Sequence, residues 1–163
     1  MAKTANSDEW YTPAWVTDPL GRFDLDPAAP VVPHRRIADN EYNIGDDGLS
    51  RPWQGRVWCN PPFSHPSVER FAERMAAHGD GIMLIFAQGF DARWFQDCVL
   101  AAASAILFLR GRVRFIGPDG RPSGSPPKGT LLVAYGDGNA EILRCSGLPG
   151  VLYIPDRGKE AAA

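Results

Sequence analysis

The sequence predicts an α/β fold with a mostly parallel sheet, and three observations support this class. Gly81–Phe86 is a continuous apolar run of strand length, which is typical of a central parallel strand covered on both faces. Patterns of helical spacing lie on either side of it, at Ser67–His78 and Ala92–Ala103. A second apolar run of strand length follows at Ala105–Leu109. Alternation of strands and helices is typical of α/β proteins.

The chain has enough residues for one domain. Its 163 residues, 44% of them apolar, can bury a substantial core, whereas two domains of ordinary size need a longer chain. We expect a single domain over residues 1–163, with an antiparallel element added to the parallel sheet and with disordered tails at 1–8 and 157–163.

The first third of the chain is irregular because five prolines interrupt it between residues 13 and 33. Proline removes a backbone donor and breaks helices, so we expect Glu9–Pro52 to be mostly loop around one short strand near Arg22–Leu25. Thr12 and Pro13 suit the start of a short helix at Ala14–Val16. In that helix threonine would be the cap and proline would take the first helical position.

The remaining strands are short. Arg56–Cys59 has the pattern of a buried strand that ends where two prolines follow. Val113–Ile116 and Thr130–Tyr135 flank a connection, 117–129, that is rich in glycine, proline and serine. We expect these two segments to form an antiparallel pair. Val151–Ile154 is a candidate edge strand.

Composition argues against several classes of protein. No apolar run reaches the roughly 20 residues of a membrane-spanning helix. The first residues are polar and lack the apolar core of a secretory signal, so we expect a cytoplasmic protein. The three cysteines lie far apart without C-x-x-C spacing, and the three histidines share no ligand-like spacing. We therefore expect neither a disulfide framework nor a metal site.

Positive charge is concentrated between residues 110 and 128, although the formal net charge of the chain is −2. Three arginines alternate there, so as an extended strand they project on one side, and two more basic residues lie in the connection that follows. Such a cluster suits contacts with a phosphate backbone, while a solvated strand face is the structural alternative. The five residues are Arg110, Arg112, Arg114, Arg121 and Lys128.

The segment most informative about chemistry is Asn60-Pro61-Pro62-Phe63, directly after a predicted strand. An amino group on a flat aromatic ring is a poor nucleophile because its lone pair is delocalised, and acceptors aimed at both of its hydrogens free that pair. The Asn60 side-chain oxygen and the Pro61 carbonyl can be these acceptors, with the prolines holding the loop rigid. Phe63 can stack on a base extruded from a duplex.

A rigid turn is the alternative interpretation of these four residues. Their place at the carboxyl end of a predicted central strand favours function, because open α/β sheets bind ligands there.

Two aspartates lie on the strand predicted in the first third. Asp24 and Asp26 are two residues apart and so point to the same face, which is unusual for a buried face unless something polar is bound there. Asp26, before Pro27 at the strand end, is the stronger candidate for binding a ligand. Asp24 could instead cap a turn or face water.

Five ordered segments resemble the phage-type DNA N6-adenine methyltransferases, a compact Dam-like family of class I enzymes that depend on S-adenosyl-L-methionine. The similarity spans about Glu9–Tyr135 and implies a single reduced Rossmann-like class I methyltransferase domain. The segments are Glu9–Pro13, Phe23–Ala29, Asp46–Leu49 with Trp53, Asn60–Phe63 and Leu109–Phe115.

The resemblance also implies roles for individual residues. Tyr11, Thr12 and Pro13 would lie against the methionine part of the methyl donor. Asp26, with Pro27 and Asp24 beside it, would bind the donor through its ribose hydroxyls or its amino group. The turn that follows Asp26 departs from the class I pattern because it contains no glycine.

The implied activity is methyl transfer to the N6 amino group of a flipped adenine in double-stranded DNA, without a metal, by a phage- or prophage-encoded enzyme in a bacterial cell. The residues themselves do not identify the substrate as adenine in DNA. Cytosine also carries its N4 amino group on a flat ring, and adenine in RNA or glutamine in a protein are further alternatives. A catalytically silent phage DNA-binding module is the alternative from another class. The recognised site, the oligomeric state and a role against host restriction stay open.

Overall fold

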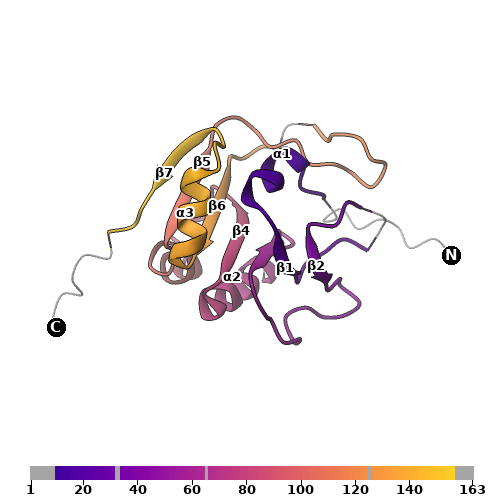
Figure 1. Ribbon diagram of the computed structural model, residues 1–163, viewed down its shortest axis with the longest axis horizontal. Coiled ribbons are helices and arrows are strands. Elements are labelled where there is room, and N and C mark those ends of the chain that lie inside the picture. Colours follow the sequence, from indigo (N-terminus) through magenta and orange to yellow (C-terminus); the bar gives the residue numbers. More distant parts are fainter. Residues whose placement is uncertain (1–9, 32–33, 65, 125, 157–163) are drawn as a thin grey trace.

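The computed structural model describes residues 10–31, 34–64, 66–124 and 126–156, so the predicted tails at 1–8 and 157–163 lie outside it. The described chain forms one seven-stranded sheet in the order β2-β1-β3-β4-β6-β5-β7 (Figure 1). The strands are β1 (Phe23–Asp26), β2 (Ala38–Glu41), β3 (Val57–Cys59), β4 (Gly81–Phe86), β5 (Ala105–Leu109), β6 (Thr130–Tyr135) and β7 (Gly150–Tyr153). The helices are α1 (Ala14–Thr17), the 3₁₀ helix η1 (Asp18–Leu20), α2 (Ser67–His78), the π-helix η2 (Phe95–Leu100) and α3 (Asp137–Cys145).

The sheet has a parallel half and an antiparallel half. β2, β1, β3 and β4 run parallel, and β6 lies antiparallel between β4 and β5, with β7 antiparallel at the edge. The α/β class is confirmed, but the antiparallel part is larger than the predicted single element. In the parallel half, the carboxyl ends of β1 and β3 meet at one edge of the sheet.

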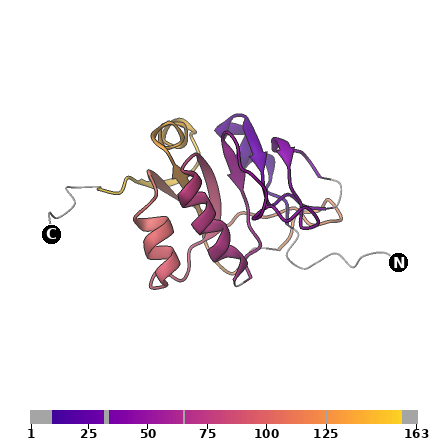
Figure 2. The same cartoon turned by 90° about the horizontal axis from the view of Figure 1, so that it is seen from below.

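Helices cover both faces of the sheet (Figure 2). α2 and η2 pack on one face, and α3 lies on the other together with α1 and η1. β4 supplies both cores, because Met83 and Ile85 belong to one and Ile82 and Leu84 to the other. This explains its continuous apolar run and confirms the prediction of a central covered strand. Within the described residues no helix is long and apolar enough to cross a membrane.

The predicted pairing of Val113–Ile116 with Thr130–Tyr135 is wrong. β6 is buried along its whole length and pairs instead with β4 and β5. Val113–Ile116 forms no strand, and Ile116 makes only isolated bridges, one of them to Tyr11. A strand buried on both faces needs a neighbour along each edge, and the longer apolar strands β4 and β5 supply both.

The first third holds more regular structure than predicted. β2 is an additional strand that was not predicted, because its sequence Ala38-Asp39-Asn40-Glu41 is polar. The strand lies at the edge of the sheet and two of its residues are exposed. α1 begins as expected, but Pro13 is its N-cap and no side chain caps it. Thr12 is therefore not the cap. Its hydroxyl instead accepts a hydrogen bond from the Asn60 side chain.

Two helices also differ from the prediction. The regular part of the helix expected at Ala92–Ala103 is the shorter π-helix η2, and α3 was not predicted. By contrast, α2, β4 and β5 have the predicted bounds.

We predict that Gly81→Ala destabilises the fold. A Cβ at residue 81 would lie 2.2 Å from the Val57 carbonyl oxygen on the neighbouring strand, so β3 and β4 would have to separate. We expect the free energy of unfolding, measured by urea denaturation, to fall by about 1–3 kcal/mol. Gly138→Ala on α3 is the matched control, because a Cβ there meets nothing within 4 Å. Equal stability of the two variants would contradict the strand spacing.

Candidate functional site

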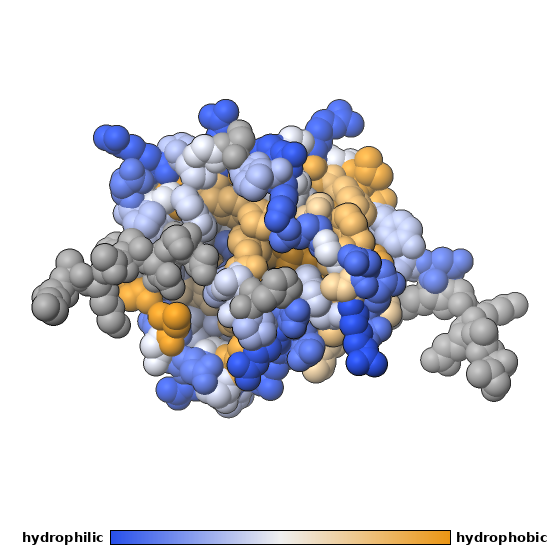
Figure 3. All heavy atoms as spheres, turned by 180° about the vertical axis from the view of Figure 1, so that it is seen from behind, coloured by the Kyte–Doolittle hydropathy of each residue, from blue (hydrophilic) through white to orange (hydrophobic). Residues whose placement is uncertain are grey.

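Two adjoining cavities open where β1 and β3 end. Cavity A, about 270 Å³, is lined by the turn 27–31, the loop residues Asn43, Ile44 and Asp47–Leu49, and Phe71 of α2. Cavity B, about 510 Å³, lies between residues 10–14, Asp26, His34–Arg35, Trp58 and the loop 116–120. Trp10, Ala28, Pro30 and Asn60 line both cavities and so form their common wall. Figure 3 shows a hollowed, largely apolar area bordered by polar side chains on the face opposite to that of Figure 1.

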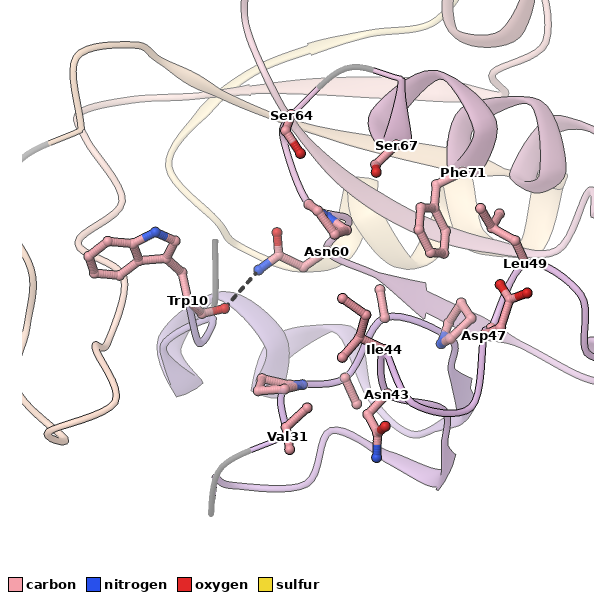
Figure 4. A pocket seen from close by; sticks show the side chains of 16 residues that line it. Trp10, Val31, Asn43, Ile44, Asp47, Leu49, Asn60, Ser64, Ser67 and Phe71 are labelled. Atoms are coloured by element: carbon pink, nitrogen blue, oxygen red, sulfur yellow. Dashed lines mark hydrogen bonds between the residues drawn. The ribbon is translucent and has the colours of Figure 1, made fainter. Parts of the chain in front are cut away.

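Asn60 occupies this common wall with its side chain oriented by two hydrogen bonds. Its Nδ2 donates to the Trp10 carbonyl oxygen at 3.3 Å and to the Thr12 hydroxyl at 3.2 Å, and Figure 4 shows the side chain directed toward Trp10. The Oδ1 atom is buried and has no hydrogen-bond partner among the described residues. A buried unpaired acceptor costs about 1–3 kcal/mol. The site therefore holds an acceptor that a donor group could satisfy.

The rest of the loop is packed against aromatic rings. Pro61 is buried, and Pro62 lines cavity A. The Phe63 ring stacks on Phe86 with centroids 3.9 Å apart and meets Phe115 edge-on at 6.4 Å. Phe63 lines neither cavity A nor B but a third, neighbouring hollow of about 300 Å³, which we call hollow C. Hollow C is also lined by Gln88, Trp94 and Lys128.

Asp26 is a buried carboxylate at the wall of cavity B. It is 4% exposed, and its Oδ1 accepts a hydrogen bond from the Ala28 backbone at 3.0 Å. The pKa of Asp26 is raised to about 7, mainly by burial and in part by Glu41, although the bond from Ala28 and the nearby His34 lower it. A cation bound in cavity B would favour the ionised carboxylate.

Asp24 has a different environment from Asp26. Its Oδ2 accepts the Arg56 backbone N–H at 2.7 Å, and it lines neither cavity. The backbone N–H groups of Asp24 and Leu25 both approach the Arg56 carbonyl, at 2.8 and 3.3 Å, and Phe23 and Leu25 pack in different cores. This local irregularity resembles a β-bulge and interrupts the alternation from which a shared face was predicted.

The turn after β1 is covered by a second loop. A Cβ at Gly48 would lie 2.0 Å from the Pro27 carbonyl oxygen, so only glycine permits this approach. Asp47 before it has a φ of 54°, and Gly48 accepts a hydrogen bond from the Trp53 indole at 2.8 Å. The close approach places Asp47 and Leu49 at the wall of cavity A.

The cavities bring together most of the predicted ligand-binding residues. Tyr11, Thr12, Pro13 and Asp26 line cavity B, and Pro27 lines cavity A. Several lining residues received no role from the sequence. The sequence offered one signal for them, the glycine in Asp46-Asp47-Gly48, which is typical of a tight turn. These residues are Trp10, His34, Asn43, Ile44, Asp47, Leu49 and Phe71.

The five predicted phosphate-binding residues, from Arg110 to Lys128, are all exposed. Arg112 and Arg114 alternate with the buried Val113 and Phe115, so their common outward direction is kept although the segment is not a strand. The same loop reaches the site, because residues 116–120 line cavity B and Lys128 lines hollow C.

Comparison with known proteins gives one finding. The family model described as DNA N-6-adenine-methyltransferase (Dam) matches residues 1–145. No curated protein and no solved structure matches the chain.

We predict that Asp26→Asn stabilises the protein at alkaline pH. The folded-state pKa of Asp26 is raised from 3.8 to about 7, so its ionisation favours the unfolded chain as pH rises through that window. The variant should therefore gain unfolding free energy on the order of 3 kcal/mol at pH 8 relative to the native chain, and little at pH 4.

Urea denaturation at the two pH values measures this difference. Asp39→Asn is the control, because Arg22 lowers the pKa of that exposed carboxyl and its replacement should not stabilise at pH 8. A gain for Asp26→Asn that is equal at both pH values would show that the carboxylate carries no burial penalty.

Proposed function

Because the chain belongs to the DNA N-6-adenine-methyltransferase (Dam) family, we propose that it transfers the methyl group of S-adenosyl-L-methionine to the N6 amino group of a flipped adenine in double-stranded DNA. Family membership implies methylation of adenine in DNA. The methyl donor, the flipped base and the residue roles are our proposal. The observation that carries it is the buried Asn60 Oδ1, which lies without a partner among the described residues at the wall between two cavities.

The topology supports a reduced class I methyltransferase domain. The sheet is parallel from β2 to β4, and one antiparallel strand, β6, is inserted before β5. Both cavities lie beyond the carboxyl ends of β1 and β3, where open α/β sheets bind ligands. A Rossmann-like domain would place its donor and its catalytic loop at this edge.

The two cavities have different chemistry, which fits the two ends of the donor. Cavity A offers apolar contacts from Ile44, Leu49 and Phe71 with the Asp47 carboxylate beside them, and would hold the nucleoside. Cavity B contains Asp26, which would bind the ammonium group of the methionine end, with Tyr11, Thr12 and Pro13 around it. When bound, the donor supplies an electrophilic methyl group on a sulfonium ion.

Asn60 and Pro61 would activate the adenine amino group. The Asn60 Oδ1 and the Pro61 carbonyl oxygen would accept its two hydrogens and release the nitrogen lone pair for attack. The bonds from Nδ2 to Trp10 and Thr12 already orient the amide, so the acceptor need not turn during the reaction.

Phe63 would provide the stacking surface for the flipped base. Extrusion costs a few kcal/mol, and stacking on an aromatic ring returns about 1–3 kcal/mol of it. Phe86 and Phe115 support the Phe63 ring. The basic loop beside this cluster would bind the DNA phosphates through Arg110, Arg112, Arg114, Arg121 and Lys128.

The product of the reaction tests the proposal directly. The purified protein is incubated with tritiated S-adenosyl-L-methionine and unmethylated genomic DNA, and the labelled nucleoside is identified by chromatography after digestion. We expect label in N6-methyladenine. Label in N4-methylcytosine would overturn the target base, and no label together with no donor binding by calorimetry would indicate a catalytically silent DNA-binding module.

Asn60→Ala separates chemistry from donor binding in the same assay. We expect turnover to fall at least about 100-fold because an acceptor for the reacting amino group is removed, while the donor dissociation constant stays nearly unchanged. Asn40→Ala is the matched control, because Asn40 lies on the edge strand β2 and lines neither cavity A nor B. Unchanged turnover in Asn60→Ala would refute the mechanism.

The basic loop is tested by salt dependence. We expect the double variant Arg112→Ala, Arg114→Ala to bind DNA more weakly and to reduce the slope of log K against log salt by about 2, because two phosphates are no longer neutralised by the protein. Arg144→Ala, an exposed arginine on α3, should leave the slope unchanged. An equal effect of both would show that the cluster is only a solvated face.

A further inference from the structure

The turn after β1 cannot bind an anion through its backbone. Pro27 and Pro30 carry no N–H group. The Ala28 N–H donates to the Asp26 carboxylate at 3.0 Å, and the Ala29 N–H donates to the Tyr42 carbonyl at 2.9 Å. Every backbone donor between Pro27 and Pro30 is therefore absent or occupied. An acidic group bound in cavity B therefore gains no backbone donor from this turn.

Two basic side chains, Arg35 and His34, line cavity B, and they contact different partners. The Arg35 guanidinium donates to Asp18 at 3.0 Å and to Thr17, which holds it against α1 and η1. The His34 side chain is only 13% exposed, and its Nε2 lies 3.2 Å from Glu41 Oε1. The His34 ring also stacks on Tyr11, with centroids 5.7 Å apart and planes at 20°. His34 is thus held in place from two sides at the cavity wall.

The wall of cavity B therefore holds an acidic and a basic side chain. Asp26 is the buried carboxylate, and His34 is close enough that its charge lowers the pKa of Asp26. The Glu41 carboxylate lies within hydrogen-bond distance of the His34 ring. The same wall includes Trp58, whose buried indole N–H has no acceptor among the described residues. A zwitterion with one ammonium and one carboxylate matches this arrangement.

We propose that His34, oriented by Glu41 and Tyr11, binds the carboxylate of the methyl donor's amino-acid end while Asp26 binds its ammonium group. This assignment rests on the proposed function, because it concerns the donor of that reaction. A side chain thereby replaces the backbone N–H groups that the proline-containing turn lacks.

The test compares two ligands that differ only in the carboxylate, S-adenosylmethionine and its decarboxylated form, by isothermal titration calorimetry. We expect His34→Ala to weaken binding of S-adenosylmethionine about 10- to 100-fold, which corresponds to removal of one charge-assisted hydrogen bond, and to change binding of the decarboxylated form less than about twofold. Asp26→Asn should weaken both ligands, because both keep the ammonium group. His78→Ala, the replacement of a histidine at the end of α2, should weaken neither.

The outcomes separate the two levels of the proposal. Equal losses of affinity for both ligands in His34→Ala, or no loss for either, would overturn the role of His34 while the donor itself stands. If the native chain binds neither ligand, the proposed donor is wrong. Retained binding of the decarboxylated form also shows that His34→Ala is folded, so misfolding cannot account for a selective loss.

Discussion

The pairing of β1 with β3 is the interaction on which the site depends. Leu25 pairs with Val57, so the ends of the two strands lie at the same edge, with Asp26 on one and Asn60 following the other. Arg56 reinforces this junction. Its backbone N–H binds Asp24, and its guanidinium donates to the Leu20 and Arg22 carbonyls and lies 4.1 Å above the Phe23 ring. Asp24 thus has a structural part in the site.

The site keeps polar groups in environments that disfavour them. Asp26 is buried with its pKa raised to about 7, and the Asn60 Oδ1 is buried without a partner among the described residues. Each reduces the stability of the ligand-free protein, and each matches a group that the proposed reaction brings, an ammonium for Asp26 and an amino hydrogen for Asn60. Such costs concentrate where a protein binds or reacts.

The short chain assembles its site from segments that would otherwise be loops. Residues 10–14 form one wall of cavity B, and the backbone groups of Tyr11 and Ile116 pair to join this segment to the loop 116–120. The loop at Asp47–Leu49 packs on Pro27 because Gly48 has no side chain. Most of the residues that line the two cavities therefore come from the proline-rich first third of the chain.

What the sequence determined by itself is local. The apolar run of β4, the bounds of α2 and the place of Asn60 after a short strand follow from periodicity and from prolines, which act within a few residues. The tertiary structure decided which segments meet: the insertion of β6 between β4 and β5, the separation of Asp24 from Asp26 and the position of His34 beside Glu41. These depend on pairing and burial between residues distant in the chain, and local patterns carry no information about such partners.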